Sequence, residues 1–364
     1  MNEIYFFDKD INSIFTLDNA ESISWVDNFN DLDTFSVKLK YELVTNTSDN
    51  RYNYYVELFE LLEKYRNDKN PIYVTLDDKE NLRACVVENY SIDEDENILE
   101  IKGRGALSVF ENIIDREHEY IATEGETKGD CAKKILESAI SRNSALSVFE
   151  IPLQRIGVAV NYITESNGVF SNVKNLLDLE DIGFKTILDY KEKKIRVLFY
   201  KNENNATIAV SEDDNNLVSN KFEFDVMSFK NYCTIKGKYN ENEIIEIVDN
   251  SNGGLMYEVK INSSNKAENM TESEYRQALR TQAEIELKKN NVQEMFEIEV
   301  SSSVQLDIGE KAVVKLNVGY KEIAKEIIAR SITHTYTDNS YERKVTFGEP
   351  ENLKADLINI LGVK

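Results

Sequence analysis

The sequence predicts an α+β fold that is mainly β: two similar small antiparallel β-barrels, an α/β middle domain between them, and a helix-containing insertion in the second barrel. Three observations predict this fold. Alternating β-branched and aromatic residues dominate both ends of the chain, apolar residues at helical spacing dominate the middle, and one hairpin pattern occurs near the end of each β region. Recurrence of a pattern far apart in a chain indicates related modules.

The recurring hairpin covers residues 86–101 and again residues 332–347. Each copy has a β-branched and aromatic strand, a polar turn and a second apolar strand, which is the local pattern of paired antiparallel strands. Aligned at one constant spacing, Tyr90 falls on Tyr336 and the second strands also coincide. The two β regions are therefore predicted to be copies of one unit, a doubling that is typical of architectural proteins rather than enzymes.

Length and composition indicate a folded protein of two or three domains. The chain has 364 residues, 41% of them hydrophobic, with 19 Tyr, 16 Phe and one Trp. Its three prolines, Pro71, Pro152 and Pro350, do not lie in a Pro/Gly/Ser-rich linker. The domains are therefore expected to pack closely.

Charge and cysteine content exclude several classes of protein. The 43 basic and 66 acidic residues give a net charge of −23, which argues against a surface that binds nucleic acid phosphates. Cys85, Cys131 and Cys233 are isolated in the sequence, so neither a disulfide framework nor a zinc site is expected. No apolar run is long enough to span a membrane, and the first residues lack the pattern of a signal peptide, so we expect a cytoplasmic site of synthesis.

Residues 1–105 form the first predicted barrel. A helix at 54–66, on which Val56, Phe59 and Leu62 recur at helical spacing, is expected to close one mouth of this barrel. Strands joined by Asp- and Asn-rich turns are predicted at 4–7, 13–17, 23–26, 34–39, 71–76 and in the hairpin within 85–103.

Residues 106–206 form the predicted α/β middle domain. Thr127 and Asp130 make a capping pattern that opens a helix with an apolar face. Ser171 is predicted to open a second helix that stops at Gly183. A hairpin of two strands, 184–188 and 195–200, is predicted to follow.

The second predicted barrel consists of residues 207–250 and 292–350. Between them, 251–291 are expected to form a helical insertion, because Thr271 and Glu274 make a capping box before a long apolar-faced helix. Residues 351–364 are predicted to be a C-terminal tail, either a helix or a segment that orders only against a partner. The strands are predicted at 220–228, 231–238, 243–248, 294–300, 311–318, 323–336 and 341–347.

The histidines and the acidic loop do not match known catalytic or metal-binding patterns. His118 and His334, the only two histidines, are far apart in the sequence, so neither a catalytic triad nor a histidine metal site is expected, and His334 is assigned a cross-strand structural role. Residues 93–97 begin like a calcium loop. However, Ile98 stands where the turn requires glycine and Arg104 where a bidentate glutamate is required, so the segment is predicted to be a solvated hairpin turn.

Glycines do not form a phosphate-binding motif. Gly103-Arg104-Gly105 and the pair Gly125 and Gly129 are interpreted as turns, and no G-x-S-x-G motif is present. No catalytic, cofactor-binding or metal-binding residue is therefore assigned, no cofactor is expected, and the residues at partner interfaces remain unassigned. The sequence predicts a protein that is not an enzyme.

A resemblance extends over almost the whole chain. It is carried by the segments 4–10, 24–25, 33–39, 99–104, 170–183, 307–314 and 343–348, which occur in the order expected of one family. In this order they resemble the baseplate hub family of phage tails and phage-tail-like contractile particles. The Asn-, Thr- and Ser-rich loop at 43–51 departs from the family, in which a tight proline turn usually follows.

The resemblance implies a homotrimer in which each subunit contributes two tube-like barrels, giving a pseudo-six-fold ring. Such a ring adapts a six-fold tail tube to a three-fold spike, so the implied partners are the tube protein, the spike protein and other baseplate proteins. The implied location is the virion or particle baseplate, assembled in a bacterial cytoplasm without stable membrane association. Acidic side chains are expected to line the lumen, through which DNA passes without specific binding.

Two alternatives from other classes stay open. A tail-associated adhesin or receptor-binding protein would use Tyr-rich loops as a sugar-stacking surface. A tail-borne cell-wall hydrolase would need a cleft with two carboxylates. The sequence also leaves open whether the particle is a phage, a headless bacteriocin or an injection system, and whether its tail contracts.

Overall fold

A computed structural model describes residues 3–18, 20–40, 50–76, 82–116, 119–165, 168–202, 204, 206, 208–211, 213, 216–300, 304–318, 321–337 and 340–348. The predicted tail at 351–364 and His118 lie outside these residues.

One large sheet of 13 strands dominates the fold. Its N-terminal strands are β1 (Ile4–Phe7), β2 (Ser13–Leu17), β3 (Ser22–Asn28), β4 (Thr34–Lys40), β5 (Tyr73–Leu76), β6 (Cys85–Asp93) and β7 (Ile98–Gly105). Its C-terminal strands are β13 (Ile208–Val210), β14 (Leu217–Asp225), β18 (Gln293–Val300), β19 (Lys311–Val318), β20 (Lys321–Thr337) and β21 (Tyr341–Gly348). The prediction of a mainly β fold with antiparallel sheets is confirmed.

The two halves of this sheet have the same strand order. We call β3–β7 module 1, in which the neighbours run β3-β4-β7-β6-β5, and β14 with β18–β21 module 2, in which they run β14-β18-β21-β20-β19. Every neighbouring pair within either module is antiparallel. Five strands that are connected and paired alike in two parts of one chain support the interpretation that the chain contains one unit twice.

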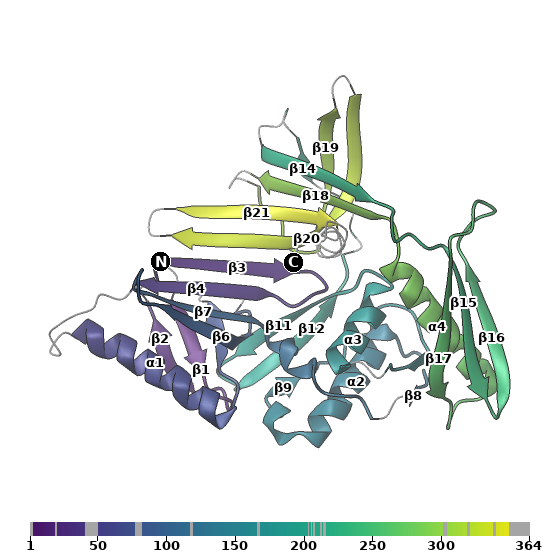
Figure 1. Cartoon of the computed structure of the whole chain (residues 1–364), viewed down its shortest axis with the longest axis horizontal. Coiled ribbons are helices and arrows are strands. Elements are labelled where there is room, and N and C mark those ends of the chain that lie inside the picture. The colour runs from purple at the N-terminus through teal and green to yellow at the C-terminus, as the bar shows by residue number, and fades with distance from the viewer. Residues whose placement is uncertain are drawn as a thin grey trace.

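The modules are joined directly, strand to strand, in a continuous sheet. β3 pairs antiparallel with β20, from Ser22 opposite Thr337 to Asn28 opposite Ser331, and Figure 1 shows the two strands side by side. The expected pair of closed barrels is therefore not what the described strands form. The edge of β3 that would have to close module 1 is occupied by β20 instead.

Both copies of the recurring hairpin are present, as β6–β7 and β20–β21. Each has a one-residue bulge in its first strand, at Glu88 in module 1 and at Arg330 in module 2. Aligning the bulges places Tyr90 on Ile332, so the sequence alignment of Tyr90 with Tyr336 is wrong in register. Alternating strands look alike when shifted by an even number of residues, which is why the sequence did not reveal the shift.

The two faces of the sheet differ in character. On one face, each module has its own apolar core, with Trp25, Phe35 and Ile101 in the first and Ile332 and Phe347 in the second. The opposite face, which we call the hydroxyl face, is polar. By register it carries Ser22, Ser24, Ser36, Ser219, Ser331, Thr333, Thr335 and Thr346, together with charged residues.

The helix predicted in module 1 is α1 (Asn50–Asp68), which lies between β4 and β5 in sequence. Leu58 and Leu62 of this helix are buried in the core of module 1. Leu62 was expected in this core from its helical spacing, whereas Leu58 was not.

The middle part contains two short helical turns, η1 (Ala106–Phe110) and η2 (Ser144–Leu146), and two helices, α2 (Lys128–Arg142) and α3 (Val169–Asp178). The predicted capping box of α2 is present, and the Asp130 carboxylate accepts a hydrogen bond from the Thr127 N–H at 2.9 Å. The predicted start of α3 is wrong, because the helix begins at Val169 after Gly168 and Ser171 lies inside its first turn. Apolar residues before Ser171 extend the helix toward the N-terminus.

Short sheets complete the middle part. The predicted hairpin is β11 (Gly183–Asp189) and β12 (Lys194–Tyr200), and β9 (Phe149–Glu150) pairs parallel with β12. A second small sheet consists of β8 (Glu119–Tyr120) and β10 (Tyr162–Ile163).

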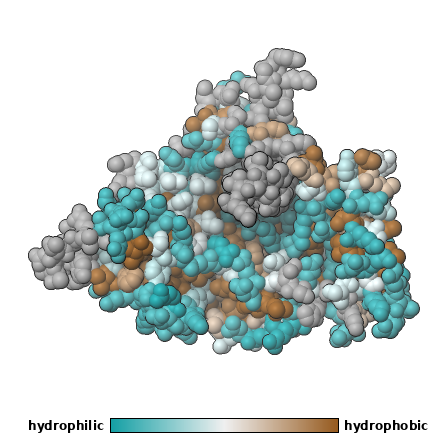
Figure 2. Space-filling view, in the orientation of Figure 1, coloured by the Kyte–Doolittle hydropathy of each residue, from teal (hydrophilic) through white to brown (hydrophobic). Residues whose placement is uncertain are grey.

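A separate unit interrupts module 2. β15 (Tyr232–Tyr239) pairs with β16 (Asn242–Asp249) and β17 (Glu258–Lys266), and one face of this sheet packs on α4 (Glu272–Lys289). The predicted capping box of Thr271 and Glu274 is present. We therefore propose an insertion over 232–289, wider than the expected 251–291, because β15 pairs with β16 on one side and β17 on the other, and none of these three strands pairs with module 2. Figure 1 shows the unit at one end of the molecule, and Figure 2 shows hydrophobic surface over β15 and β16.

Candidate functional site

The junction between the two modules brings together charged residues from three parts of the chain. β3 contributes Asp27, β20 contributes His334, and Arg83 comes from the segment before β6. That segment is held by the middle part, because the Ala84 N–H donates to the Thr186 carbonyl at 3.0 Å and the Leu188 N–H to the Leu82 carbonyl at 2.7 Å. Arg83 is thereby fixed between β11 and the large sheet.

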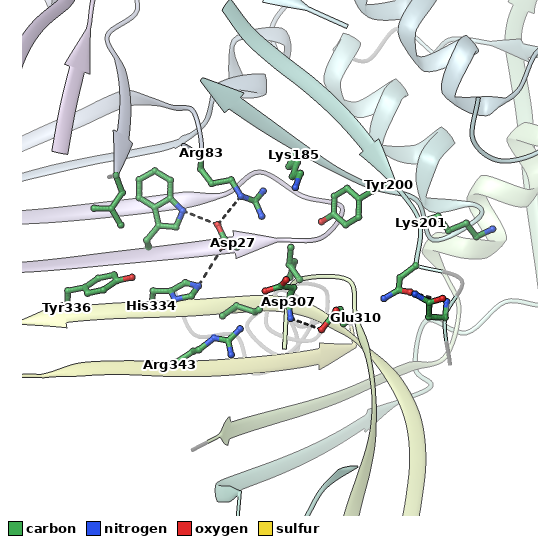
Figure 3. Close-up of a pocket in the computed structure, with 16 residues that line it drawn as sticks. Asp27, Arg83, Lys185, Tyr200, Lys201, Asp307, Glu310, His334, Tyr336 and Arg343 are labelled. Atoms are coloured by element: carbon green, nitrogen blue, oxygen red, sulfur yellow. Dashed lines mark hydrogen bonds and ion pairs between the residues drawn. The ribbon is translucent and has the colours of Figure 1, made fainter. Parts of the chain in front are cut away.

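Asp27 is the centre of this network. Its carboxylate accepts a hydrogen bond from the Trp25 indole Nε1–H at 3.0 Å, and it lies 3.6 Å from Arg83 Nε and 3.6 Å from His334 Nε2 (Figure 3). On the other side of the imidazole ring, His334 Nδ1 is 2.8 Å from the Tyr341 hydroxyl. Burial alone would raise the pKa of Asp27, but the hydrogen bond with His334 and the charge of Arg83 outweigh it and lower the pKa.

Asp33 is the second carboxylate of the network. It is 5% exposed, lies 3.4 Å from Arg83 Nη1 and accepts a hydrogen bond from the Asn28 N–H at 2.8 Å. Burial raises the pKa of Asp33 to about 7, and the nearby charge of Asp27 adds to the increase. One guanidinium thus serves two buried carboxylates, of which Asp27 is the ionised one and Asp33 titrates near neutral pH.

The charge state of Asp33 predicts a pH effect on stability. The folded chain keeps this proton up to a pH of about 7, whereas an unfolded aspartate releases it near 3.8. The contribution of Asp33 to the free energy of unfolding is therefore full below about pH 4 and is lost as the pH rises to 7, by at most about 1.4 kcal/mol per pH unit. Relative to Asp33→Asn, the wild type is expected to lose stability across this window.

Urea unfolding of both proteins, followed by the fluorescence of the single Trp25 at several pH values from about 5 to 8, measures this difference. Asp95→Asn, at an exposed carboxylate in the β6–β7 turn, is the matched control and should follow the wild type. Parallel curves for wild type and Asp33→Asn would show that Asp33 is ionised throughout.

A cavity of about 610 Å³ lies beside this network. Figure 3 shows its two sides, with Asp27, His334 and Arg343 on the large sheet and Lys185 and Tyr200 on β11 and β12. Burial raises the pKa of the Tyr200 hydroxyl, and burial together with the charge of Arg83 lowers the pKa of Lys185. Acidic and basic groups are mixed in the wall, so the cavity has no strong preference for a ligand of one charge.

Phe29, just after β3, makes a second set of contacts at the same junction. Its N–H donates to the Arg330 carbonyl at 2.9 Å, and its carbonyl accepts from the Phe184 N–H at 2.9 Å. The Arg330 guanidinium lies 5.1 Å from the centre of the Phe29 ring and donates to Asp181 at 2.6 Å. A Cβ on Gly309, where φ is +82°, would come within 2.6 Å of this ring. Module 1, module 2 and β11 therefore meet at one packed residue.

The arrangement is suited to holding distant segments of the chain together. None of the described residues that line the cavity is a serine, threonine or cysteine, so no side-chain nucleophile of these types adjoins His334. Among the described residues, no group of three His, Cys, Asp or Glu side chains is arranged to hold a metal ion. The lining instead supplies ion pairs and hydrogen bonds between segments distant in sequence.

The structure confirms the interpretation of His334 and of the acidic loop, and corrects that of Gly103 and Gly105. His334 lies on β20 opposite Trp25 and Arg343, so its cross-strand role is confirmed. Asp93 ends β6 and stabilises the β6–β7 turn, because its carboxylate accepts hydrogen bonds from the N–H groups of Asp95 and Glu96 at 3.0 Å. Gly103 and Gly105 lie in β7 rather than in a turn, so that interpretation is wrong.

Asp27, Asp33 and Arg83 were not identified in the sequence. One signal was present in the strand Ser22–Asn28: alternation places Asp27 on the same face of the strand as the buried Ile23 and Trp25. A charge on the core face of a strand requires a buried partner. The sequence could have shown that a partner exists, but not that it is Arg83.

None of the described helices is both long and apolar enough to cross a membrane.

The whole fold is similar to that of solved tail proteins, two of which come from prophages. These include the 43 kDa tail protein of prophage MuSo2 from Shewanella oneidensis (12% identity, 96% of this chain and 99% of that chain, TM-score 0.55). They also include a tail protein from Neisseria meningitidis MC58 (10% identity, 96% of this chain and 97% of that chain, TM-score 0.56). A third is prophage tail protein gp18 from Listeria monocytogenes EGD-e (12% identity, 100% of both chains, TM-score 0.54). The fold is thus that of a phage tail protein.

Residues 3–349 match the Siphovirus ReqiPepy6 Gp37-like protein family, and the chain belongs to this family. No curated protein sequence matches the chain. The resemblance to a phage tail protein family that the sequence suggested is confirmed.

Proposed function

We propose that the protein is a baseplate hub: three copies form a pseudo-six-fold ring that joins a six-fold tail tube to a three-fold spike. The observation that carries the proposal is the repeated strand order of modules 1 and 2. Two equivalent units in each of three chains make six, which is what a trimer needs to match a six-fold partner. Proposed partners are therefore a second and third copy, the tube protein, the spike protein and other baseplate proteins.

The proposal assigns a role to each part of the chain. The proposed domains are module 1 with its flanking strands at 1–105, the middle part at 106–206, and module 2 at 207–231 and 290–350, interrupted by the insertion. The two modules form the ring and the junction around Asp27 fixes the angle between them. The role is structural rather than enzymatic. The described lining of the junction cavity agrees with this role, because it contains ion-paired side chains and no Ser, Thr or Cys.

The hydroxyl face of the sheet lines the bore in this proposal, because the apolar cores of both modules lie on the other face. The described charged residues on this face are of both signs and include Lys38, Lys40, Lys102, Arg104, Lys221, Lys311, Lys315 and Lys344 with Asp93, Glu100, Glu299, Glu326 and Glu342. In this proposal the described part of the lining carries charges of both signs, whereas mainly acidic side chains were expected. A face of hydroxyl groups and charges of both signs presents no large field of one sign to a polyanion such as DNA.

The mass and shape of the purified chain test the proposal. We expect a trimer by light scattering at high protein concentration, dissociating on dilution by mass action, and ring-shaped particles in electron micrographs. A monomer at every concentration, with no ring in the presence of the tube protein, would contradict the hub. A monomer that forms rings only with the tube protein would retain it.

A further inference from the structure

One strand edge in each module is open in the described chain. β6 pairs with β7 along its length, but its other edge pairs with β5 only at Cys85 and Val86, which leaves the edge over residues 89–93 without a strand. At the far end of the sheet, β14 pairs with β18 on one side only among the described strands. Open edges present backbone N–H and C=O groups that can accept another strand.

Module 2 shows what fills the equivalent edge. Aligned at the bulges, β20 corresponds to β6: Ile327 and Ile328 pair with β19 as Cys85 and Val86 pair with β5. Beyond the bulge, the edge of β20 over 331–337 is paired with β3. The strand that corresponds to β3 in module 2 is β14, because each is the first strand of its module and lies at the outer end of the same strand order.

We infer that β14 of a second copy pairs antiparallel with the open edge of β6, as β3 pairs with β20 within the chain. This interface between copies rests on the proposed ring and specifies how the ring closes. Each chain donates β14 to one neighbour and offers β6 to the other, so the contact is head-to-tail and repeats around the ring.

The internal repeat also gives the register of this contact. Across module 1, Ser24, Ser36, Lys102 and Asn89 lie in one row of paired residues. The corresponding row of module 2 contains Lys221, Glu297, Thr346 and Ser331. Lys221 therefore corresponds to Ser24 and Phe222 to Trp25.

Within the chain, Trp25 lies opposite His334 and Ser24 opposite Thr335. Measured from the bulges, His334 corresponds to Ile92 and Thr335 to Asp93. The register between copies thus places Phe222 opposite Ile92 and Lys221 opposite Asp93.

The residues brought together in this register suit each other. Phe222 is 43% exposed and Ile92 is 45% exposed in the single chain, although both lie on the core-facing side of their strands, and their pairing would cover both. On the other face, Lys221 and Asp93 have opposite charges, which stabilise a directly opposed antiparallel pair. A shift by one residue would place apolar residues on the hydroxyl face.

A groove beside β6 provides space for the neighbouring module. Its volume is about 820 Å³, and it is lined by Phe59 and Leu62 of α1, Tyr90 and Ile92 of β6, and Ile113 after η1. The cavity at the junction within the chain is lined in the same way by core-facing residues of the equivalent strand β20, namely Ile332, His334 and Tyr336. The groove in module 1 therefore corresponds to the cavity at that junction. In a single chain it lacks the side that the neighbouring copy would supply.

Disulfide trapping tests the register. The double variant Phe222→Cys/Ile92→Cys places two thiols on directly opposed residues, whose Cα separation in an antiparallel pair of about 4.5–5.5 Å permits a disulfide. Both positions are partly exposed, so the variant should fold, and the three native cysteines are buried. Under mild oxidation we expect covalent dimers and trimers on a non-reducing gel.

The control is Phe222→Cys/Ser91→Cys, since Ser91 is the neighbour of Ile92 on the opposite face, and each single variant controls for the native thiols. Native mass is measured in parallel. A trimer that cross-links through Ser91 instead, or through neither pair, would overturn the register and leave the hub standing. A chain that stays monomeric and uncross-linked, and forms no ring in the presence of the tube protein, would overturn both proposals.

Discussion

Arg83→Met is expected to lower the free energy of unfolding by about 3–5 kcal/mol, the largest effect of any single substitution at the junction. Removing one partner of a buried ion pair leaves an uncompensated buried charge, and here the guanidinium serves two carboxylates, Asp27 and Asp33. Methionine keeps most of the side-chain volume, so the loss reports the charge rather than a cavity. Urea unfolding followed by Trp25 fluorescence measures it at the junction itself, because the indole donates to Asp27.

Arg196→Met is the matched control. Arg196 also contacts two carboxylates, Glu150 at 3.0 Å and Asp189 at 3.3 Å, but its side chain is 42% exposed. Exposed ion pairs contribute about 0–1 kcal/mol, so this variant should unfold close to the wild type. Equal effects of the two substitutions would show that the Arg83 network does not hold the modules together.

Gly103→Ala is expected to destabilise the chain by about 2–3 kcal/mol through overpacking opposite the bulge of β6. A Cβ at this position would lie 1.9 Å from the Val86 carbonyl oxygen and 2.6 Å from the Phe35 ring. The carbonyl belongs to the backbone of the neighbouring strand, so only a shift of β6 against β7 relieves the overlap. The ring of Trp25 is stacked on Phe35, with centroids 5.7 Å apart, and its emission should change in the folded state.

The same substitution at Gly254 separates this overlap from a general effect of alanine. A Cβ there would meet only the Ser251 carbonyl oxygen at 3.1 Å, and its φ is not in the left-handed region, so the change should be within about 0.5 kcal/mol. Unchanged stability and emission of Gly103→Ala would mean that β6 and β7 can separate at the bulge without cost.

Local features of the fold could be predicted from the sequence, because local residues determine them. The capping boxes at Thr127 and Thr271 fix the starts of α2 and α4, and alternation of apolar and polar residues identifies the strands of both hairpins. The start of α3 was misplaced because its first turn lacks a side-chain cap, so Ser171 was the nearest available signal.

Features that depend on pairing between distant segments could not be predicted in this way. Whether Tyr232–Tyr239 belongs to module 2 or to the insertion depends on its neighbours in the sheet, and its alternation is compatible with both. The candidate site is a stronger example. Asp27, Arg83 and His334 come together only because β20 pairs with β3 and because β11 holds the segment before β6, and no local pattern encodes either contact.

The pairing of β3 with β20 also sets an order of events during synthesis. β3 leaves the ribosome near the start of translation, whereas β20 is among the last strands made, so at 5–20 residues per second the two are separated by roughly 15–60 s. During that interval β3 has an edge that could pair with another nascent chain. An inward-pointing charge is a known protection for such an edge, and Asp27 provides one. The Asp27 carboxylate, which stabilises the junction in the folded chain, thus first disfavours pairing of β3 with another nascent chain.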